Sequence, residues 1–105
     1  MKYKILLFLA CLPFSSANTQ VITGAEQTKN YFSLLKNKRI GLFTNHTGII
    51  SNEHLADVLH RKGFNLKFIF APEHGFRGNA DAGEKIQDEI DKKTGIPIVG
   101  KNNLG

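Results

Sequence analysis

Two short polar segments contain the side chains best suited to chemistry. They are residues 45–48 (NHTG) and residues 72–78 (PEHGFRG). In the second segment Glu73 and His74 place a carboxyl group beside an imidazole, and both groups transfer protons in general acid–base catalysis. Partial burial raises the pKa of a glutamate carboxyl and makes it a better proton donor. In the alternative interpretation Glu73 accepts hydrogen bonds from backbone amides while the ring of His74 packs, and spacing alone favours neither.

Residues 75–78 could also hold an anion, because glycine-rich backbone presents amide groups and Arg77 adds a positive charge. The lysine and hydroxyl residue of a Walker loop are missing, and no dinucleotide fingerprint is present. Asp81 and Glu84 follow as further carboxylates, and glycoside hydrolysis generally uses two. A hydrophilic loop is the alternative for both residues, and for Glu84 it is the favoured one.

Histidine and carboxylate side chains raise the question of a metal site. His46, Glu73 and His74 show no recognised ligand spacing, and a structural zinc site usually has four ligands. His54 and His60 fall within a predicted helix, where we expect both to be exposed. The sequence therefore predicts no metal and no cofactor.

The two polar segments follow predicted strands. Mostly apolar runs predict strands at 39–45, 66–71 and 96–99. Between the first two strands, residues 55–59 carry the apolar stripe of a helix, which Ser51 or Asn52 is expected to cap. Strand, helix and strand within about 30 residues form a parallel βαβ unit with a right-handed crossover. Binding sites lie at the carboxyl ends of such strands, so both polar segments are expected at the same edge of an α/β sheet.

The flanking segments have weaker patterns. Thr23 and Glu26 match a capping box at the start of a helix expected over residues 25–37. Residues 85–92 alternate charged and apolar side chains, which suits a loose helix or an extended segment equally well. Residues 91–95 predict a turn before the third strand.

The first 17 residues have the features of a secretory signal peptide. Lys2 and Lys4 precede a short apolar stretch, and small residues end at Ala17. The apolar stretch is shorter than the about 20 residues of a membrane span, so no stable membrane anchor is expected. Cys11 could accept a lipid, but plain cleavage is the favoured interpretation. The sequence therefore predicts export to the periplasm or the exterior.

Cleavage after Ala17 changes the composition. Of the 105 residues 88 remain, which is enough for one small domain, and the formal charge falls from +5 to +3. That charge is ordinary for a domain of this size, so nucleic-acid binding is not expected. Because Cys11 is the only cysteine, the mature chain has no internal disulfide and no thiolate nucleophile.

The polar segments and their neighbours resemble a known family. Residues 38–48 (KRIGLFTNHTG), 70–78 (FAPEHGFRG) and 80–84 (ADAGE) strongly resemble the N-terminal part of the bacterial exo-β-N-acetylmuramidases, the NamZ-type glycoside hydrolases. Residues 21–26 (VITGAE) match the family's usual mature start, and the resemblance extends over residues 21–99. It implies a Rossmann-like catalytic domain followed by a further domain. It also implies release of N-acetylmuramic acid from the non-reducing ends of peptidoglycan fragments.

The resemblance implies roles for individual residues. Glu73 falls on the glutamate of the family's Pro-Glu-His-Gly motif and is the leading catalytic candidate, with His74 beside it. Arg77 is expected to pair with the lactyl carboxylate that distinguishes muramic acid from glucosamine. The residues expected to bind the saccharide are Asn45, His46, Arg77 and Asp81.

Members of this family are several times longer, and the sequence ends as its third strand begins. We therefore expect residues 18–105 to be a truncated N-terminal part of the catalytic domain, an incomplete Rossmann-like sheet too short to act as an enzyme alone. Such a sheet exposes apolar surface that the missing part of its domain would cover. Two functions remain open: a fragment of a secreted glycosidase of cell-wall recycling, and a non-catalytic saccharide-binding module or inactive remnant. The second catalytic group also remains open.

Overall fold

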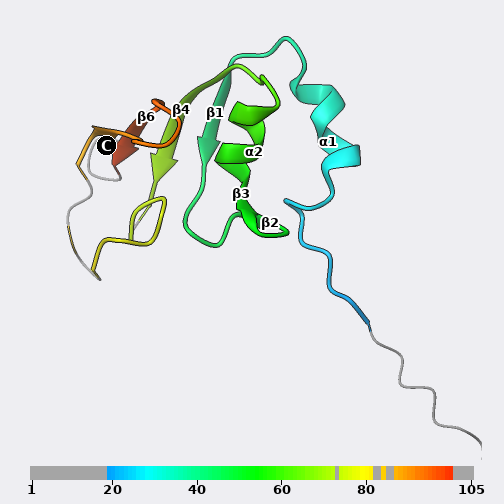
Figure 1. Cartoon of the computed structure of the whole chain (residues 1–105), viewed down its shortest axis with the longest axis horizontal. Coiled ribbons are helices and arrows are strands. Elements are labelled where there is room, and N and C mark those ends of the chain that lie inside the picture. Colours follow the sequence, from blue (N-terminus) through cyan, green and yellow to red (C-terminus); the bar gives the residue numbers. More distant parts are fainter. Residues whose placement is uncertain (1–18, 73, 82–83, 85–86, 101–105) are drawn as a thin grey trace, which may run out of the picture.

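The computed structural model describes residues 19–72, 74–81, 84 and 87–100, and Figure 1 shows the arrangement of their elements. The expected signal peptide and the end of the chain at residues 101–105 lie outside the described residues. The elements in chain order are α1 (Thr28–Leu35), β1 (Ile40–Phe43), β2 (Ile49–Ile50), β3 (Glu53–His54), α2 (Leu55–Arg61), β4 (Leu66–Ala71), β5 (Glu89–Ile90) and β6 (Pro97–Gly100).

The main sheet has the strand order β1-β4-β6-β5 in the described part of the chain. Strands β1, β4 and β6 are parallel, whereas β5 is antiparallel to β6. Strands β2 and β3 form a separate antiparallel pair that leads directly into α2. The fold is therefore α/β with a mixed sheet.

The parallel βαβ unit is confirmed. Strands β1 and β4 are parallel, with Leu42 opposite Ile69 and Phe43 opposite Phe70, and α2 lies in the connection between them. Their register shifts by one residue between Ile40 and Gly41. The first strand is shorter than expected. Its last ladder bond runs from the Thr44 amide to the Phe70 carbonyl (3.1 Å), and the backbone then turns.

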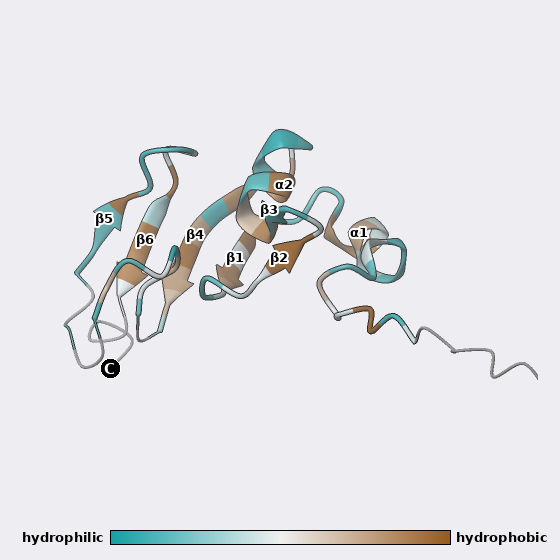
Figure 2. Ribbon diagram, turned by 60° about the horizontal axis from the view of Figure 1, so that its bottom comes forward, coloured by the Kyte–Doolittle hydropathy of each residue, from teal (hydrophilic) through white to brown (hydrophobic). Residues whose placement is uncertain are grey.

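The hydrophobic core lies between α2 and one face of the sheet. Leu59 of α2 and Ile69 of β4 are its largest fully buried side chains. Figure 2 shows α2 on one side of the strands. Phe43 and Phe68 are exposed, and Phe68 lies 6.4 Å from Phe70 between ring centroids. Apolar surface is thus left uncovered by the described residues, as expected for part of a parallel sheet.

The first helix lies within the expected range of about residues 25–37 and is shorter at both ends. Thr23 and Glu26 do make capping-box contacts: the Thr23 amide donates to Glu26 Oε2 (2.9 Å) and the Glu26 amide to Thr23 Oγ1 (3.4 Å). These contacts close a turn ahead of the helix, because the backbone bonds there span three residues instead of four. Helix α1 begins at Thr28, and Asn37 beyond its end has a left-handed φ of 58°.

The predicted cap of the second helix was wrong. Ser51 and Asn52 form the turn between β2 and β3, where Ser51 has a φ of 55°. The cap is His54, whose Nδ1 accepts a hydrogen bond from the Ala56 amide (3.1 Å). The hairpin between β1 and the helix could not be read from local pattern, because each of its strands has only two residues.

In the segment at residues 85–92, which suited a loose helix or an extended chain, Glu89–Ile90 form the strand β5 and Lys92 already belongs to the next turn. Glu89 pairs with Ile98 and Ile90 with Pro97 in the antiparallel ladder of β5 and β6. The turn expected at residues 91–95 is confirmed, since the Gly95 amide donates to the Asp91 carbonyl (2.7 Å). Among the described residues no helix is long and apolar enough to cross a membrane.

The two leucines Leu59 and Leu34 provide a matched test of the core. Leu59 is 1% exposed and Leu34, on α1, is 69% exposed. We expect Leu59→Ala to lower the free energy of unfolding by about 2–5 kcal/mol, because it leaves a cavity. Leu34→Ala should change it by less than about 0.5 kcal/mol. Urea unfolding followed by circular dichroism measures both, and equal losses would contradict this assignment of the core.

Candidate functional site at the carboxyl edge of the sheet

The loops after β1 and β4 meet at one edge of the sheet, as the sequence predicts. Gly78 has a φ of +74°, and a Cβ placed on it would lie 2.9 Å from the Cβ and Cγ of His46. A glycine is needed here both for the left-handed backbone and for the close approach of the His46 side chain. The two polar segments are therefore in direct contact.

Asn45 fixes the shape of the first loop. Its Oδ1 accepts hydrogen bonds from the Thr47 amide (3.0 Å) and the Thr47 hydroxyl (2.7 Å), which form an Asx turn. Its carbonyl oxygen lies 2.7 Å from His54 Nε2. The side chain of His46, next in the loop, is exposed. Of the two predicted saccharide ligands in this loop, Asn45 is bound within the loop and His46 faces solvent.

The second loop makes a sharp turn directly after Glu73, which itself lies outside the described residues. His74 and Gly75 have φ values of 68° and 70°. The Gly75 amide donates to the Pro72 carbonyl (3.2 Å), and the Ala80 amide donates to the His74 carbonyl (3.3 Å). A left-handed histidine costs about 1–3 kcal/mol relative to relaxed backbone, so the surrounding contacts must hold it there.

His74 and Asp81 are both exposed. The Nδ1 of His74 lies 3.3 Å from the Ala80 carbonyl oxygen. The Asp81 amide donates to Glu84 Oε2 (2.8 Å), and the Glu84 amide donates to the Asp81 carbonyl (3.1 Å). These bonds support the interpretation of Glu84 as part of a hydrophilic turn.

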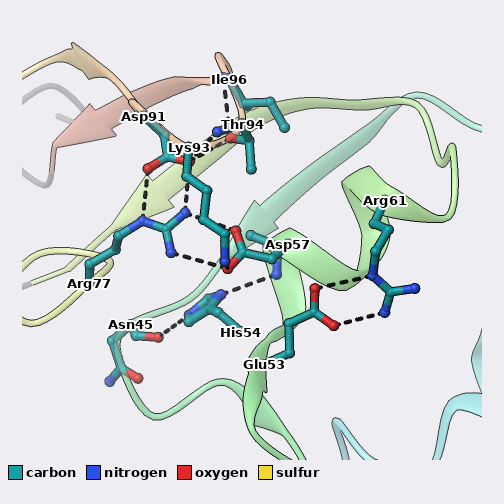
Figure 3. Close-up of polar contacts among 11 residues, drawn as sticks. Asn45, Glu53, His54, Asp57, Arg61, Arg77, Asp91, Lys93, Thr94 and Ile96 are labelled. Carbon is teal, nitrogen blue, oxygen red and sulfur yellow. Dashed lines mark hydrogen bonds and ion pairs between the residues drawn. The ribbon is translucent and has the colours of Figure 1, made fainter.

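Arg77 connects the second loop to two other elements. Its Nε and Nη2 donate to the two carboxylate oxygens of Asp91 (2.8 Å each), and Figure 3 shows the arrangement. Its Nη2 and Nη1 also donate to the two oxygens of Asp57 on α2 (2.9 and 3.3 Å). Lys93 Nζ reaches Asp57 Oδ2 as well (2.6 Å). We call Asp57, Arg77, Asp91 and Lys93 the ion cluster.

The two acids of the ion cluster are ionised despite their burial. The side chains of Asp57 and Asp91 are 5% and 4% exposed. Burial opposes ionisation of Asp91, but hydrogen bonds from Arg77 and Thr94 outweigh it and lower the pKa of Asp91 to about 2. For Asp57 burial also opposes ionisation, and the bonds from Arg77 and Lys93 lower its pKa. These buried carboxylates are thus anions matched by the two cations.

An aromatic contact links the ion cluster to the first loop. Phe76 is 2% exposed, and the Arg77 guanidinium lies over its ring at 4.3 Å. The Phe76 ring meets the His54 ring edge-on, with centroids 4.6 Å apart. Our expectation that His54 is exposed was wrong, since it is buried between Phe76 and the Asn45 carbonyl. The exposed position predicted for His60 is confirmed.

The sequence reasoning missed three residues of this edge: His54, Asp57 and Asp91. One signal was available for Asp57, which lies between Ala56 and Val58 in the apolar stripe of the second helix. An acid inside such a stripe points to a buried cationic partner. Asp91 begins a predicted turn, where an aspartate is common. No local feature indicated that it pairs with Arg77.

A pocket of about 700 Å³ lies beside the ion cluster. It is lined by the loop after β4, by β5 and by the turn that follows β5, with residues that include Arg77, Asn79, Glu84, Glu89, Asp91 and Lys93. Phe76, Ile90 and Ile98 add apolar surface. A volume in the range of about 300–1,000 Å³ with a few polar groups on apolar walls is typical of small-molecule sites.

Comparison with known proteins identifies similar chains. Residues 40–101 match the family model described as "Exo-beta-N-acetylmuramidase NamZ, N-terminal". The chain is 44% identical over 71 residues to the peptidoglycan beta-N-acetylmuramidase NamZ of Bacillus subtilis strain 168, which covers 66% of this chain and 17% of that protein.

Two solved structures of DUF1343 family proteins from Bacteroides fragilis NCTC 9343 are also similar. One is 56% identical with a TM-score of 0.64, over 77% of this chain and 20% of that chain. The other is 38% identical with a TM-score of 0.60, over 73% of this chain and 19% of that chain. The chain thus spans about a fifth of the length of these relatives.

His54 should make stability depend on pH. Its Nδ1 accepts from the Ala56 amide, so the ring must be neutral there, and Nε2 then donates to Asn45. Burial lowers the pKa of His54 despite the opposing effect of the Asn45 carbonyl. The unfolded chain therefore binds the proton more readily, and stability falls as pH drops below about 6.5.

We expect His54→Asn to flatten the dependence of the unfolding free energy on pH between about 5 and 7, because Asn keeps a capping oxygen but does not titrate. His60→Asn, on the exposed side of the same helix, is the matched control and should leave the dependence as it is. Urea titrations at several pH values measure both. An unchanged slope in the His54 variant would contradict the buried neutral state.

Proposed function

The chain belongs to the NamZ exo-β-N-acetylmuramidase family, and we propose that it supplies the N-terminal part of a glycosidase acting on peptidoglycan. The proposed reaction releases N-acetylmuramic acid from the non-reducing ends of peptidoglycan fragments. The observation that carries this proposal is the extent of the family match. Residues 40–101 run from β1 to just past β6, so they include both loops of the carboxyl edge.

We also propose the finer features of fold and location. Residues 18–105 would form part of a Rossmann-like domain, and the parallel βαβ unit supports this assignment. Residues 1–17 would act as a signal peptide that exports the protein to the periplasm or the exterior, with lipidation at Cys11 the less favoured route. Either compartment would bring the enzyme to peptidoglycan, its proposed substrate.

In the proposed mechanism Glu73 is the general acid. Its carboxyl proton passes to the glycosidic oxygen as the bond to the anomeric carbon breaks, and Glu73 is left as a carboxylate. Its position in sequence, between Pro72 at the end of β4 and the exposed His74, supports this role. A parallel strand that ends in a polar loop presents such a group to a ligand at the sheet edge.

The reaction also needs a group on the opposite face of the sugar ring. Asp81, which is exposed, is one candidate, and the substrate's own acetamido group and a carboxylate elsewhere in the protein are the others. Asp57 and Asp91 are poorly suited, because both carboxylates are buried and paired with cations. We propose Asn45, His46 and Asp81 as saccharide-binding residues, since they lie on the two loops of this edge.

The role proposed for Arg77 competes with contacts already made. Pairing with the lactyl carboxylate would require its guanidinium to bind a third carboxylate beside those of Asp57 and Asp91. The pocket beside the ion cluster also has room for a saccharide. Residues of this chain alone form the pocket. The pocket therefore supports the second candidate function, a non-catalytic module that binds cell-wall saccharides.

The role of Glu73 is tested by Glu73→Gln in the full-length gene product, with a chromogenic β-N-acetylmuramide as substrate. We expect turnover to fall by about 10²–10⁴-fold, the usual contribution of a general acid. Glu53→Gln is the matched control. Glu53 is partly exposed, pairs with Arg61 and belongs to neither polar loop nor to the ion cluster, so that variant should keep its activity.

Near-normal turnover in the Glu73 variant would remove this residue from the mechanism. If the gene product binds muropeptides in a calorimetric titration but releases no sugar, the binding module is the better description. Circular dichroism of each variant checks that folding is intact.

A further inference from the structure

We propose that Arg77 is a positioning residue, which fixes the loop that carries Glu73, and that it does not bind the substrate's carboxylate. The proposal rests on the proposed function, because it concerns how the general acid is held. It differs from the role that the sequence suggested for Arg77, and it follows from the ion cluster.

Arg77 joins three segments that are distant in sequence. Its partners Asp57 and Asp91 lie 20 residues before it and 14 residues after it, on α2 and in the turn that leads to β6. Asp91 is itself fixed, since it also accepts from the Thr94 amide (2.9 Å) and the Thr94 hydroxyl (2.6 Å). Figure 3 shows the guanidinium between the two carboxylates. The side chain of Arg77 thus bonds the loop after β4 both to α2 and to the turn before β6.

The charges of the ion cluster leave little attraction for another anion. All three guanidinium nitrogens of Arg77 already donate to carboxylate oxygens. Two anions, Asp57 and Asp91, are balanced by two cations, Arg77 and Lys93. A substrate carboxylate placed at this guanidinium would meet two fixed carboxylates at short range, where the repulsion is strong. The geometry therefore favours a structural use of the guanidinium.

The contacts require the shape of arginine as well as its charge. A planar guanidinium can pair with two carboxylates at once through its parallel N–H groups, whereas an ammonium acts as a single point charge. The flat face of the guanidinium also covers the ring of Phe76 at 4.3 Å. Lysine at this position would keep the charge and lose both the double pairing and the stacking.

The attachment extends to the residues around Glu73. Phe76, which stacks under the guanidinium, packs on His54, and His54 contacts the carbonyl of Asn45 in the first loop. Within the second loop the Gly75 amide bonds to Pro72 and the Ala80 amide to the His74 carbonyl, on either side of the left-handed turn. Glu73 lies between Pro72 and His74 in sequence, so the two described residues next to it both belong to this bonded turn.

Amide hydrogen exchange of the 105-residue chain tests the attachment without any activity. In Arg77→Lys we expect exchange at Gly75 and Ala80 to become at least about tenfold faster, while the Lys62 amide at the end of α2 keeps its rate. Arg61→Lys is the matched control. Arg61 also forms a two-bond pair, with Glu53 (3.2 and 2.8 Å), but its side chain is 59% exposed and away from the edge.

Two results would overturn the proposal. Unchanged exchange at Gly75 and Ala80 would show that Arg77 does not fix the loop. An equal acceleration at Lys62 and throughout β4 would show that Arg77 supports only global stability.

Kinetics of the full-length gene product separate positioning from binding. In Arg77→Lys we expect kcat to fall by about 10²-fold, as for a misplaced catalytic group, with KM changed by less than about threefold. The preference for muramic acid over N-acetylglucosamine should be unchanged. A raised KM with lost preference and normal kcat would instead make Arg77 a substrate ligand and overturn the proposal.

Glu73→Gln measured alongside distinguishes this outcome from a failure of the proposed function. If that variant turns over normally, Glu73 is not the acid, and the kinetic arm no longer applies to Arg77. The exchange experiment then decides alone whether Arg77 fixes the loop.

Discussion

The pairing of Arg77 with the buried carboxylates of Asp57 and Asp91 is the interaction on which the carboxyl edge of the sheet depends. Burying charges costs desolvation energy, and a buried ion pair adds little net stability over a well-packed apolar contact. Removing one partner is different, because it leaves an uncompensated charge in the interior, at a typical cost of about 3–5 kcal/mol. The ion cluster therefore joins α2, the loop after β4 and the turn before β6 by contacts that are costly to break one at a time.

A second link, through neutral groups, holds the other loop to the same edge. His54 caps α2 with one ring nitrogen and contacts the Asn45 carbonyl with the other, while its ring packs against Phe76. Phe76 in turn lies under the Arg77 guanidinium. The loops after β1 and β4 are thus joined through one continuous set of contacts, and Gly78 closely approaches His46 between the same two loops.

The family match includes all the residues of this arrangement. The matched residues 40–101 include the parallel strands and both loops, and their most buried polar groups belong to the ion cluster. The glycosidase proposed above requires its acid to be held within a narrow range of position and orientation. A loop bonded to both α2 and the turn before β6 meets that need better than a free loop at the end of a strand. The exposed phenylalanines Phe43 and Phe68 belong to the same sheet, and they contribute apolar surface that the described residues leave open.

The sequence by itself determined the parallel βαβ unit, the further parallel strand that follows it and the meeting of two polar loops at one edge. These features follow from local apolar periodicity and from the fixed geometry of a parallel crossover, which a short stretch of chain contains. Only the tertiary structure decided the cap of α2, the extended form of β5 and the partners of Arg77. The cap of α2 is His54 and not Ser51 or Asn52, because those two residues form the turn of a hairpin. The same hairpin places the His54 ring against Phe76. The partners of Arg77 lie 14 and 20 residues away, so their pairing depends on how the segments pack and not on their own propensities.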